Sequence, residues 1–205
     1  MNKNIMVVGI LGKAGAGKDT VARALLHRFG AVAEPRFTEQ FAFATLLKET
    51  AARMFRLTHS QLYDQGSKEV IDPRWGKSPR TLLQELGSAM RAIHPDVFWR
   101  ATELEIAEWH EENGSPSKSL AVISDCRHEN EAAWIRSVGG VLLRVVRPGA
   151  GLSGANATHE SETAADAITV DLTLHNSGTL EDLICLAKEQ LPVLERWVGR
   201  YMRPE

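Results

Sequence analysis

The residues that most constrain this chain lie near its amino terminus, where a short apolar run leads into a glycine-rich loop. The run Ile5–Leu11, with the sequence IMVVGIL, has the length and composition of a buried β-strand. Residues 12–20, with the sequence GKAGAGKDT, fit the pattern of a glycine, four residues, a second glycine and a lysine. Apolar residues then recur at helical spacing over residues 21–29. The order of strand, glycine-rich loop and helix predicts a site for a polyphosphate chain.

This loop has two properties that suit phosphate. Its glycines allow a tight turn that brings backbone N–H groups close to phosphate oxygens. Lys18 adds a positive charge at the start of the expected helix. We therefore predict that a nucleotide's phosphate chain is bound by Gly12, Lys13, Ala14, Gly15, Ala16, Gly17, Lys18, Asp19 and Thr20.

The residue after the lysine separates classes of phosphate-loop proteins. The usual pattern has Ser or Thr there to hold Mg²⁺, whereas this chain has Asp19 and places the hydroxyl one residue later, at Thr20. Kinases of nucleoside monophosphates often lack that hydroxyl, while switch GTPases and ATP motors depend on it. The sequence also has neither the NKxD nor the DxxG stretch of a switch GTPase. The loop therefore favours a small-molecule kinase.

Composition narrows the function by exclusion. A chain of 205 residues is the size of one ordinary domain, and 24 basic against 26 acidic residues leave a net charge of −2. That balance does not indicate binding to nucleic acid polymers or to a membrane surface. The amino-terminal apolar run is too short for a signal peptide or a membrane span, and Cys126 and Cys185 form no CxxC pair. We expect a cytoplasmic protein whose partners are small-molecule nucleotides, and a homodimer is left open.

Strands and helices are expected to alternate along the chain. Apolar runs predict further strands that end near Phe41 and that cover residues 120–123, 141–146 and 172–174. Helices are expected at about 42–55, 78–93, 96–110 and 129–138, and from about 179 to 197, whereas residues 56–77 are expected to be irregular. This alternation predicts an α/β sandwich of three layers, with a parallel sheet that binds ligands at the carboxyl ends of its strands. Residues 149–161, rich in glycine and poor in apolar residues, are a candidate lid.

The ordered motifs of the chain resemble those of the deoxynucleoside monophosphate kinases typical of tailed bacteriophages, and the likeness covers nearly the whole sequence. Its anchors are GKAGAGKDT at 12–20, FAFATLLKE at 41–49, SPRTLLQELG at 78–87, Phe98 with Trp99, ISDCRHENEA at 123–132, RVVRPG at 144–149, HESE at 159–162 and HNSGTLEDL at 175–183. The chain departs from the family at Ala44 and Thr45, where an acidic residue and a proline are usual, and at His128. These departures bear on the choice of substrate more than on the type of reaction.

The resemblance implies a single P-loop kinase domain over residues 1–205, of the nucleoside monophosphate kinase type. Residues 42–110 would form a helical insertion that binds the acceptor, and residues 149–161 a lid. The implied reaction is ATP-dependent phosphoryl transfer to deoxynucleoside 5′-monophosphates, with Mg²⁺, giving the diphosphates.

Transfer between two polyanions needs positive charge near the migrating group. Lys18, Arg127 and Arg147 are the candidate cations, and Arg147 is favoured over Arg144, which should point to the other face of the sheet. Asp19 and Asp125 are the carboxylates available for Mg²⁺, through bound water. Two simpler roles stay open: Asp19 could only support its helix through the backbone dipole, and Arg127 could form a surface ion pair with Glu131.

For the acceptor, Arg80, Gln84 and Arg91 fall on one face of the helix expected at 78–93. Arg80 would clamp the 5′-phosphate and Gln84 would contact the base or sugar, although an ordinary solvated face has the same spacing. Trp99 is a candidate apolar wall against the 2′ carbon of the sugar. The resemblance adds four further substrate-binding candidates: Lys48, Glu131, His159 and Glu162.

Two other functions are left open. Phosphomevalonate kinases of the animal type also resemble this loop with aspartate after the lysine, and a panel of acceptors would separate the two classes. A non-enzymatic module that binds ATP and regulates a partner is the second alternative. Arginines and carboxylates at three strand ends argue against it, because a binder needs only the loop.

Overall fold

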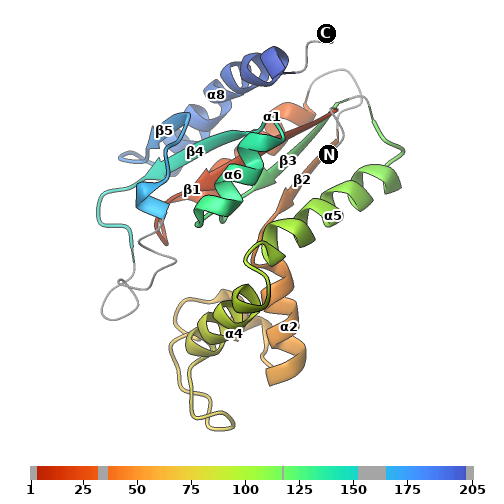
Figure 1. Cartoon of the computed structure of the whole chain (residues 1–205). Coiled ribbons are helices and arrows are strands. Elements are labelled where there is room, and N and C mark those ends of the chain that lie inside the picture. Colours follow the sequence, from red (N-terminus) through yellow and green to blue (C-terminus); the bar gives the residue numbers. More distant parts are fainter. Residues whose placement is uncertain (1–3, 32–36, 117, 152–164, 202–205) are drawn as a thin grey trace. The chain divides into compact units, whose positions relative to one another are not determined.

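The computed structural model describes residues 4–31, 37–116, 118–151 and 165–201, and these form two compact units (Figure 1). The first unit comprises residues 1–42 and 102–205, and the second comprises residues 43–101. In the described residues, none of the helices is long and apolar enough to cross a membrane.

The first unit is built on a five-stranded sheet in the order β2-β3-β1-β4-β5. The strands are β1 (Ile5–Leu11), β2 (Phe37–Phe41), β3 (Ser119–Ile123), β4 (Val141–Val146) and β5 (Leu172–His175). All four pairings between neighbouring strands are parallel. The carboxyl ends of the strands therefore lie at one edge of the sheet, where the loops that follow β1, β3 and β4 begin.

Helices cover both faces of this sheet. On one face, α1 (Lys18–Gly30) and α8 (Leu180–Tyr201) pack against each other and bury a continuous apolar core with β1, β3 and β4. On the other face, α6 (Glu129–Ser137) packs on β1 and β4 (Figure 1). The predicted three-layer α/β sandwich of P-loop kinase type is confirmed, because the phosphate loop follows the central strand of a fully parallel sheet.

Helix α5 (Val97–Glu112) begins in the second unit and ends in the first. The part of α5 that belongs to the first unit makes two side-chain hydrogen bonds, one near the middle of the helix and one in its last turn. Nδ1 of the buried His110 lies 3.2 Å from Oγ of Ser119 at the start of β3, and Nε1 of Trp134 donates to Oε1 of Glu103 at 3.2 Å. These contacts hold α5 beside β3 and α6.

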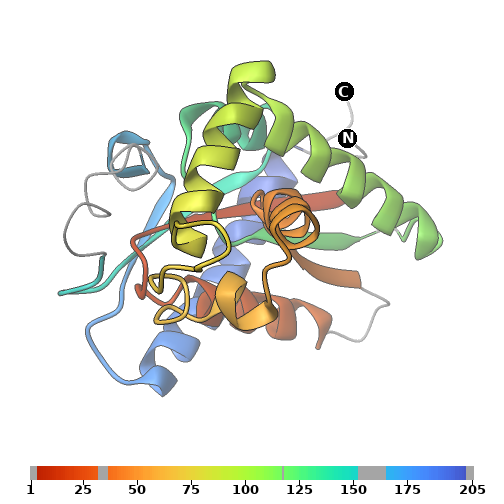
Figure 2. The same ribbon diagram turned by 90° about the horizontal axis from the view of Figure 1, so that it is seen from below.

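The second unit is helical. It contains α2 (Thr45–Phe55), α3 (His59–Tyr63), α4 (Pro79–Ile93) and the first residues of α5. Helix α2, seen nearly along its axis in Figure 2, packs against α4. The small core of this unit consists of Ala51, Leu57, Leu62 and Leu82, with Ala52, Phe55, Leu83 and Leu86 packed around it.

Local caps explain where two of these helices begin. Ser78 caps α4 by accepting a hydrogen bond from the N–H of Thr81 at 3.2 Å, and Pro79 follows at the first helical position, as the sequence predicts. Helix α3 corrects the expectation that residues 56–77 are irregular throughout. Thr58 and Gln61 form a reciprocal capping box at its start, a signal that is present in the sequence.

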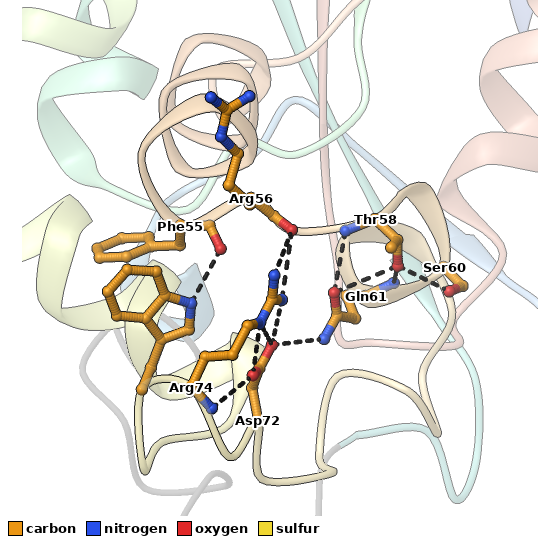
Figure 3. Close-up of polar contacts among 8 residues, drawn as sticks. Phe55, Arg56, Thr58, Ser60, Gln61, Asp72 and Arg74 are labelled. Atoms are coloured by element: carbon orange, nitrogen blue, oxygen red, sulfur yellow. Dashed lines mark hydrogen bonds and ion pairs between the residues drawn. The ribbon is translucent and has the colours of Figure 1, made fainter.

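The segment between α3 and α4 is folded around one buried carboxylate (Figure 3). Asp72 accepts hydrogen bonds from the guanidinium of Arg74 at both of its oxygens and from Nε2 of Gln61 at 3.0 Å. Arg74 also donates to the backbone carbonyl of Arg56 at 3.3 Å. The Arg74 guanidinium holds the pKa of Asp72 well below its usual range. This pair ties residues 72–74 to the end of α2 and to α3.

Candidate active site

The loop after β1 has the backbone that its sequence predicts. Gly12, Gly15 and Gly17 have φ values of 146°, 75° and 104°, which side chains other than glycine rarely adopt. At two of these positions a larger residue would also collide with neighbouring atoms. A Cβ on Gly12 would lie 2.5 Å from the carbonyl oxygen of Val145, and one on Gly17 would lie 2.8 Å from Cδ2 of Leu183. The loop is thus pressed against β4 and α8 as well as being turned.

Lys18, the first residue of α1, extends its ammonium back over the loop. Its Nζ donates to the carbonyl oxygens of Gly12 at 2.8 Å and of Lys13 at 3.0 Å. This arrangement keeps a positive charge at the loop, where a polyphosphate would need it. Asp19 and the half-buried Thr20 follow in the first turn of the helix.

Groups outside the loop bind its carbonyl oxygens. Nδ2 of Asn176, just after β5, donates to Ala16 at 2.9 Å, and the N–H of Gly151 donates to Ala14 at 3.0 Å. A carbonyl oxygen repels phosphate. Hydrogen bonds to these carbonyl oxygens therefore favour a loop conformation in which the N–H groups, and not the carbonyls, face a bound phosphate. Asn176 contacts the phosphate loop and was not singled out from the sequence, although it lies in the motif HNSGTLEDL.

Asp19 is joined to the end of β3 through Gln40. The side-chain amide of Gln40 donates to Oδ1 of Asp19 at 3.1 Å and to Oγ of Ser124 at 2.9 Å. Ser124 is buried directly after β3, and Asp125 follows it, half-buried. Of the two carboxylates predicted to bind Mg²⁺, Asp19 is therefore bound by Gln40, and Asp125 follows Ser124, which is bound by the same side chain.

Glu131 has a well-defined role in the loop between β3 and α6. Its Oε2, on a side chain that is buried, accepts the backbone N–H groups of Arg127 at 2.8 Å and of His128 at 3.0 Å. It is the third residue of α6 and forms a capping box at its start. Glu131, expected to bind substrate, therefore supports the backbone on either side of Arg127.

Burial raises the pKa of the neighbouring Cys126 thiol far above its usual range, so this cysteine is a poor nucleophile.

The two arginines of β4 and its end have different surroundings. Arg144 donates through Nη2 to the carbonyl oxygens of Ala165 at 2.8 Å and Ile168 at 2.6 Å, and so anchors that segment. Arg147, exposed just after β4, places Nη1 3.5 Å from the carbonyl oxygen of Gly15. Arg147 lies at the phosphate loop, whereas Arg144 holds structure together.

Three or more His, Cys, Asp or Glu side chains grouped as metal ligands are not found among the described residues. Mg²⁺ in kinases does not require such a group, because one or two carboxylates together with substrate phosphates and water complete its coordination. Asp19 and Asp125 have the oxygen donors that this ion prefers.

In the second unit, the predicted acceptor residues have partners of their own. Nε of Arg80 lies 2.5 Å from Oε1 of Glu69, and its Nη2 donates to Gln65 at 2.9 Å. The guanidinium of Arg91 stacks over the ring of Phe98 at 4.5 Å.

The other acceptor candidates of this unit lie next to aromatic rings or are partly buried. Nζ of Lys48 lies 4.4 Å above the ring of Tyr63, and the guanidinium of Arg100 lies 5.0 Å above the ring of Trp99. Gln84 is half-buried on α4. His159, Glu162 and residues 152–161 of the expected lid lie outside the described residues.

Comparison with known proteins identifies the family. The chain is 33% identical over 190 residues to a protein of Acanthamoeba polyphaga mimivirus assigned as a deoxynucleotide monophosphate kinase, an alignment that covers 87% of this chain and 92% of the relative. The chain belongs to the deoxynucleotide monophosphate kinase family. The resemblance seen in the sequence motifs is confirmed, and the chain is a kinase, that is, a phosphotransferase.

A second relative has the same name. The deoxynucleotide monophosphate kinase of Enterobacteria phage T4 is 30% identical over 125 residues, which is 60% of this chain and 48% of the phage protein. No family model matches the chain.

Two solved structures that are similar to this chain are named as kinases. A shikimate kinase from Aquifex aeolicus has a TM-score of 0.42 at 13% identity, covering 93% of this chain and 97% of its own. A sugar kinase from Janibacter has a TM-score of 0.47 at 16% identity, covering 94% and 98%. Because both scores are below 0.5, the fold assignment rests on the strand order and the phosphate loop described above.

Proposed function

We propose that this chain transfers the terminal phosphoryl group of ATP to the 5′-phosphate of a deoxynucleoside monophosphate, giving ADP and a deoxynucleoside diphosphate. The observation that carries the proposal is the phosphate loop, with Lys18 held across it, in a chain that belongs to this family. One P–O bond of ATP breaks, and one forms to an oxygen of the acceptor phosphate.

The donor phosphates would be bound by residues 12–20. The ammonium of Lys18 would exchange the carbonyl oxygens of Gly12 and Lys13 for the oxygens of the terminal phosphates, which carry full negative charge and accept stronger hydrogen bonds. The hydroxyl of Thr20 would contact a more interior phosphate. The contact of Asn176 with Ala16 supports this role by fixing the loop before the nucleotide arrives.

The charge that develops during transfer would be met by arginines at the edge of the sheet. Arg147, beside Gly15, and Arg127, whose backbone is held by Glu131, are the residues we assign to this role. Asp19 and Asp125 would hold Mg²⁺ through bound water. When bound, this ion neutralises phosphate charge and helps to fix the geometry of the phosphates.

For the acceptor we assign residues of the second unit. Arg80 would bind the 5′-phosphate, with Arg91 and Lys48 as further cations, Gln84 as a hydrogen-bonding partner of the base or sugar, and Trp99 as the wall beside the sugar. Glu131 would act by positioning Arg127, and His159 and Glu162 remain candidates for contact with substrate. A cytoplasmic location is part of the proposal, because Cys126 and Cys185 are both free thiols.

The test is a coupled ADP-release assay with the purified chain, Mg²⁺ and ATP, run across the four deoxy- and four ribonucleoside monophosphates and phosphomevalonate. We expect ADP release that depends on at least one deoxynucleoside monophosphate. Release only with phosphomevalonate would replace the proposed acceptor class. ATP binding without acceptor-dependent release would indicate a regulatory module.

A further inference from the structure

Gln40 joins two groups of the first unit that are far apart in the sequence. Its side-chain amide uses one N–H to bind Oδ1 of Asp19 and another to bind Oγ of Ser124, which is 84 residues away. Gln40 lies near the carboxyl end of β2, where the neighbouring Phe41 pairs with Ile123 of β3. The three polar side chains therefore meet at the same edge of the sheet as the phosphate loop.

The position of Asp19 allows its carboxylate to compete with a bound phosphate for the N–H groups at the start of α1, and the hydrogen bond from Gln40 opposes this competition. The first turn of an α-helix has N–H groups without partners in the helix, and these attract carboxylates as well as phosphates. Asp19 lies in the first turn of α1, so its own carboxylate is a potential competitor for the N–H groups that a bound phosphate needs. The hydrogen bond from Gln40 draws Oδ1 toward the ends of β2 and β3 instead.

The chemistry of the amide matters as much as its position. A glutamine side chain carries no charge, so it orients Asp19 while leaving the carboxylate negative and able to serve a cation. The same amide binds the oxygen of Ser124, which leaves that hydroxyl its own O–H to donate elsewhere. A cationic side chain in place of Gln40 would pair with the Asp19 carboxylate and leave it less able to bind a metal cation.

We infer that Gln40 is a positioning residue for the donor nucleotide, which holds the Asp19 carboxylate at the sheet edge and away from the N–H groups of α1. The inference rests on the proposed function for the identity of the nucleotide, ATP. The positioning itself is a property of the first unit alone.

The test is the dissociation constant of ATP, measured by isothermal titration calorimetry on the full chain in the absence of metal, so that no step of catalysis enters the result. Gln40→Leu removes both hydrogen bonds and should raise the dissociation constant roughly three- to tenfold, which is the effect of one ordinary hydrogen bond. Gln40→Glu keeps the length of the side chain but replaces the donor with a second carboxylate, and it should weaken binding at least as much.

The decisive measurement is a double-mutant cycle with Asp19→Ala. If Gln40 acts by restraining Asp19, then removing the competing carboxylate should restore metal-free ATP affinity in Gln40→Leu to about the value of Asp19→Ala alone. A purely structural role for Gln40 would not be relieved in this way. The matched control is Thr38→Val, two residues earlier on the same face of β2, which should bind ATP as the wild type does.

Equal ATP affinity of Gln40→Leu and Thr38→Val would overturn the inference, and so would a loss that Asp19→Ala does not relieve. These outcomes differ from failure of the proposed function. Wild-type protein that binds ATP but phosphorylates no deoxynucleoside monophosphate would refute the function and leave the role of Gln40 decided by calorimetry. A wild type that does not bind ATP would refute both.

Discussion

In the second unit, Nε of Arg80 lies 2.5 Å from Oε1 of Glu69, so the arginine proposed to bind the acceptor phosphate is paired with a carboxylate of its own chain. The side chain of Arg80 is only 14% exposed, whereas that of Glu69 is 47% exposed. An anionic phosphate and the carboxylate would compete for the same guanidinium. Glu69 is the member of the pair that is more exposed to water, so replacing its carboxylate disturbs less packing than replacing Arg80 would.

We predict that Glu69→Gln lowers the KM for the deoxynucleoside monophosphate by about two- to fivefold, which is the effect of removing one ion pair near the surface. The change leaves the KM for ATP as it is. Steady-state kinetics with each substrate varied in turn measures both values. Glu85→Gln is the matched control. Glu85 forms an ion pair with Lys77 in the same unit, and its loss should leave both constants unchanged.

Lys18→Ala should lower kcat by at least ~100-fold, because the ammonium is expected to follow the charge of the transferred phosphoryl group. The fold should be unaffected, since the two hydrogen bonds that Lys18 makes are to carbonyls of a partly exposed loop. Activity and melting temperature are measured together. Lys118→Ala, at the amino end of β3, is the control, and near-normal turnover in Lys18→Ala would contradict the site.

Asn176→Ala should raise the KM for ATP by roughly tenfold and leave the KM for the acceptor unchanged. The variant removes the buried hydrogen bond to Ala16, and an unsatisfied buried carbonyl costs about 1–3 kcal/mol. We expect the loop to change conformation in response to this loss, and the changed loop should bind ATP more weakly. Asn113→Ala, which removes a side-chain contact to Trp109 in a distant turn, is the matched control. An equal rise in both KM values would point to general unfolding instead.

Stability of the second unit should depend on pH through Asp72. Because Arg74 lowers the folded-state pKa of Asp72 below the unfolded value of about 3.9, the ionised carboxylate stabilises the fold above that value. The stabilisation is lost as the pH falls through the folded-state pKa. Asp72→Asn should therefore melt several degrees below the wild type at pH 7, and the difference should shrink below about pH 4. Thermal melts by circular dichroism at pH 7 and at a pH well below 4 test this, and a difference between the two proteins that does not change with pH would contradict it.

Trp99 is the candidate that decides between deoxyribose and ribose. A ribose 2′-hydroxyl buried against an aromatic wall without a partner would cost ~1–3 kcal/mol, or roughly ten- to a hundredfold in specificity. Trp99→Ala should therefore lower the ratio of kcat/KM for dGMP to that for GMP, or for another matched pair if guanine is not accepted. Trp75→Phe is the control, because it keeps the aromatic contact with Phe55. An unchanged ratio would remove Trp99 from the sugar site.

Local signals in the sequence were sufficient to predict most of the strands and helices and the phosphate loop. The strands Ile5–Leu11 and Val141–Val146 have the predicted bounds, because short apolar runs bounded by glycine or proline have few alternatives in a buried parallel sheet. The glycines of the loop and the cap at Ser78 depend only on backbone conformation within a few residues. The same kind of signal, a capping box at Thr58, is present in the sequence at the start of α3, which was not among the predicted helices.

Tertiary structure alone decided which side chains meet. Gln40 has no motif to mark it, yet it binds Asp19 and Ser124 because parallel pairing of β2 with β3 brings their ends to one edge. Asn176 reaches the carbonyl of Ala16 across 160 residues for a similar reason, since β5 ends beside the loop. Hydrophobic periodicity determines the face on which a residue lies, but the order of strands comes from packing of the whole sheet between its helices. The sequence therefore determined which chemical groups this protein has, and the fold decided which of these groups contact one another.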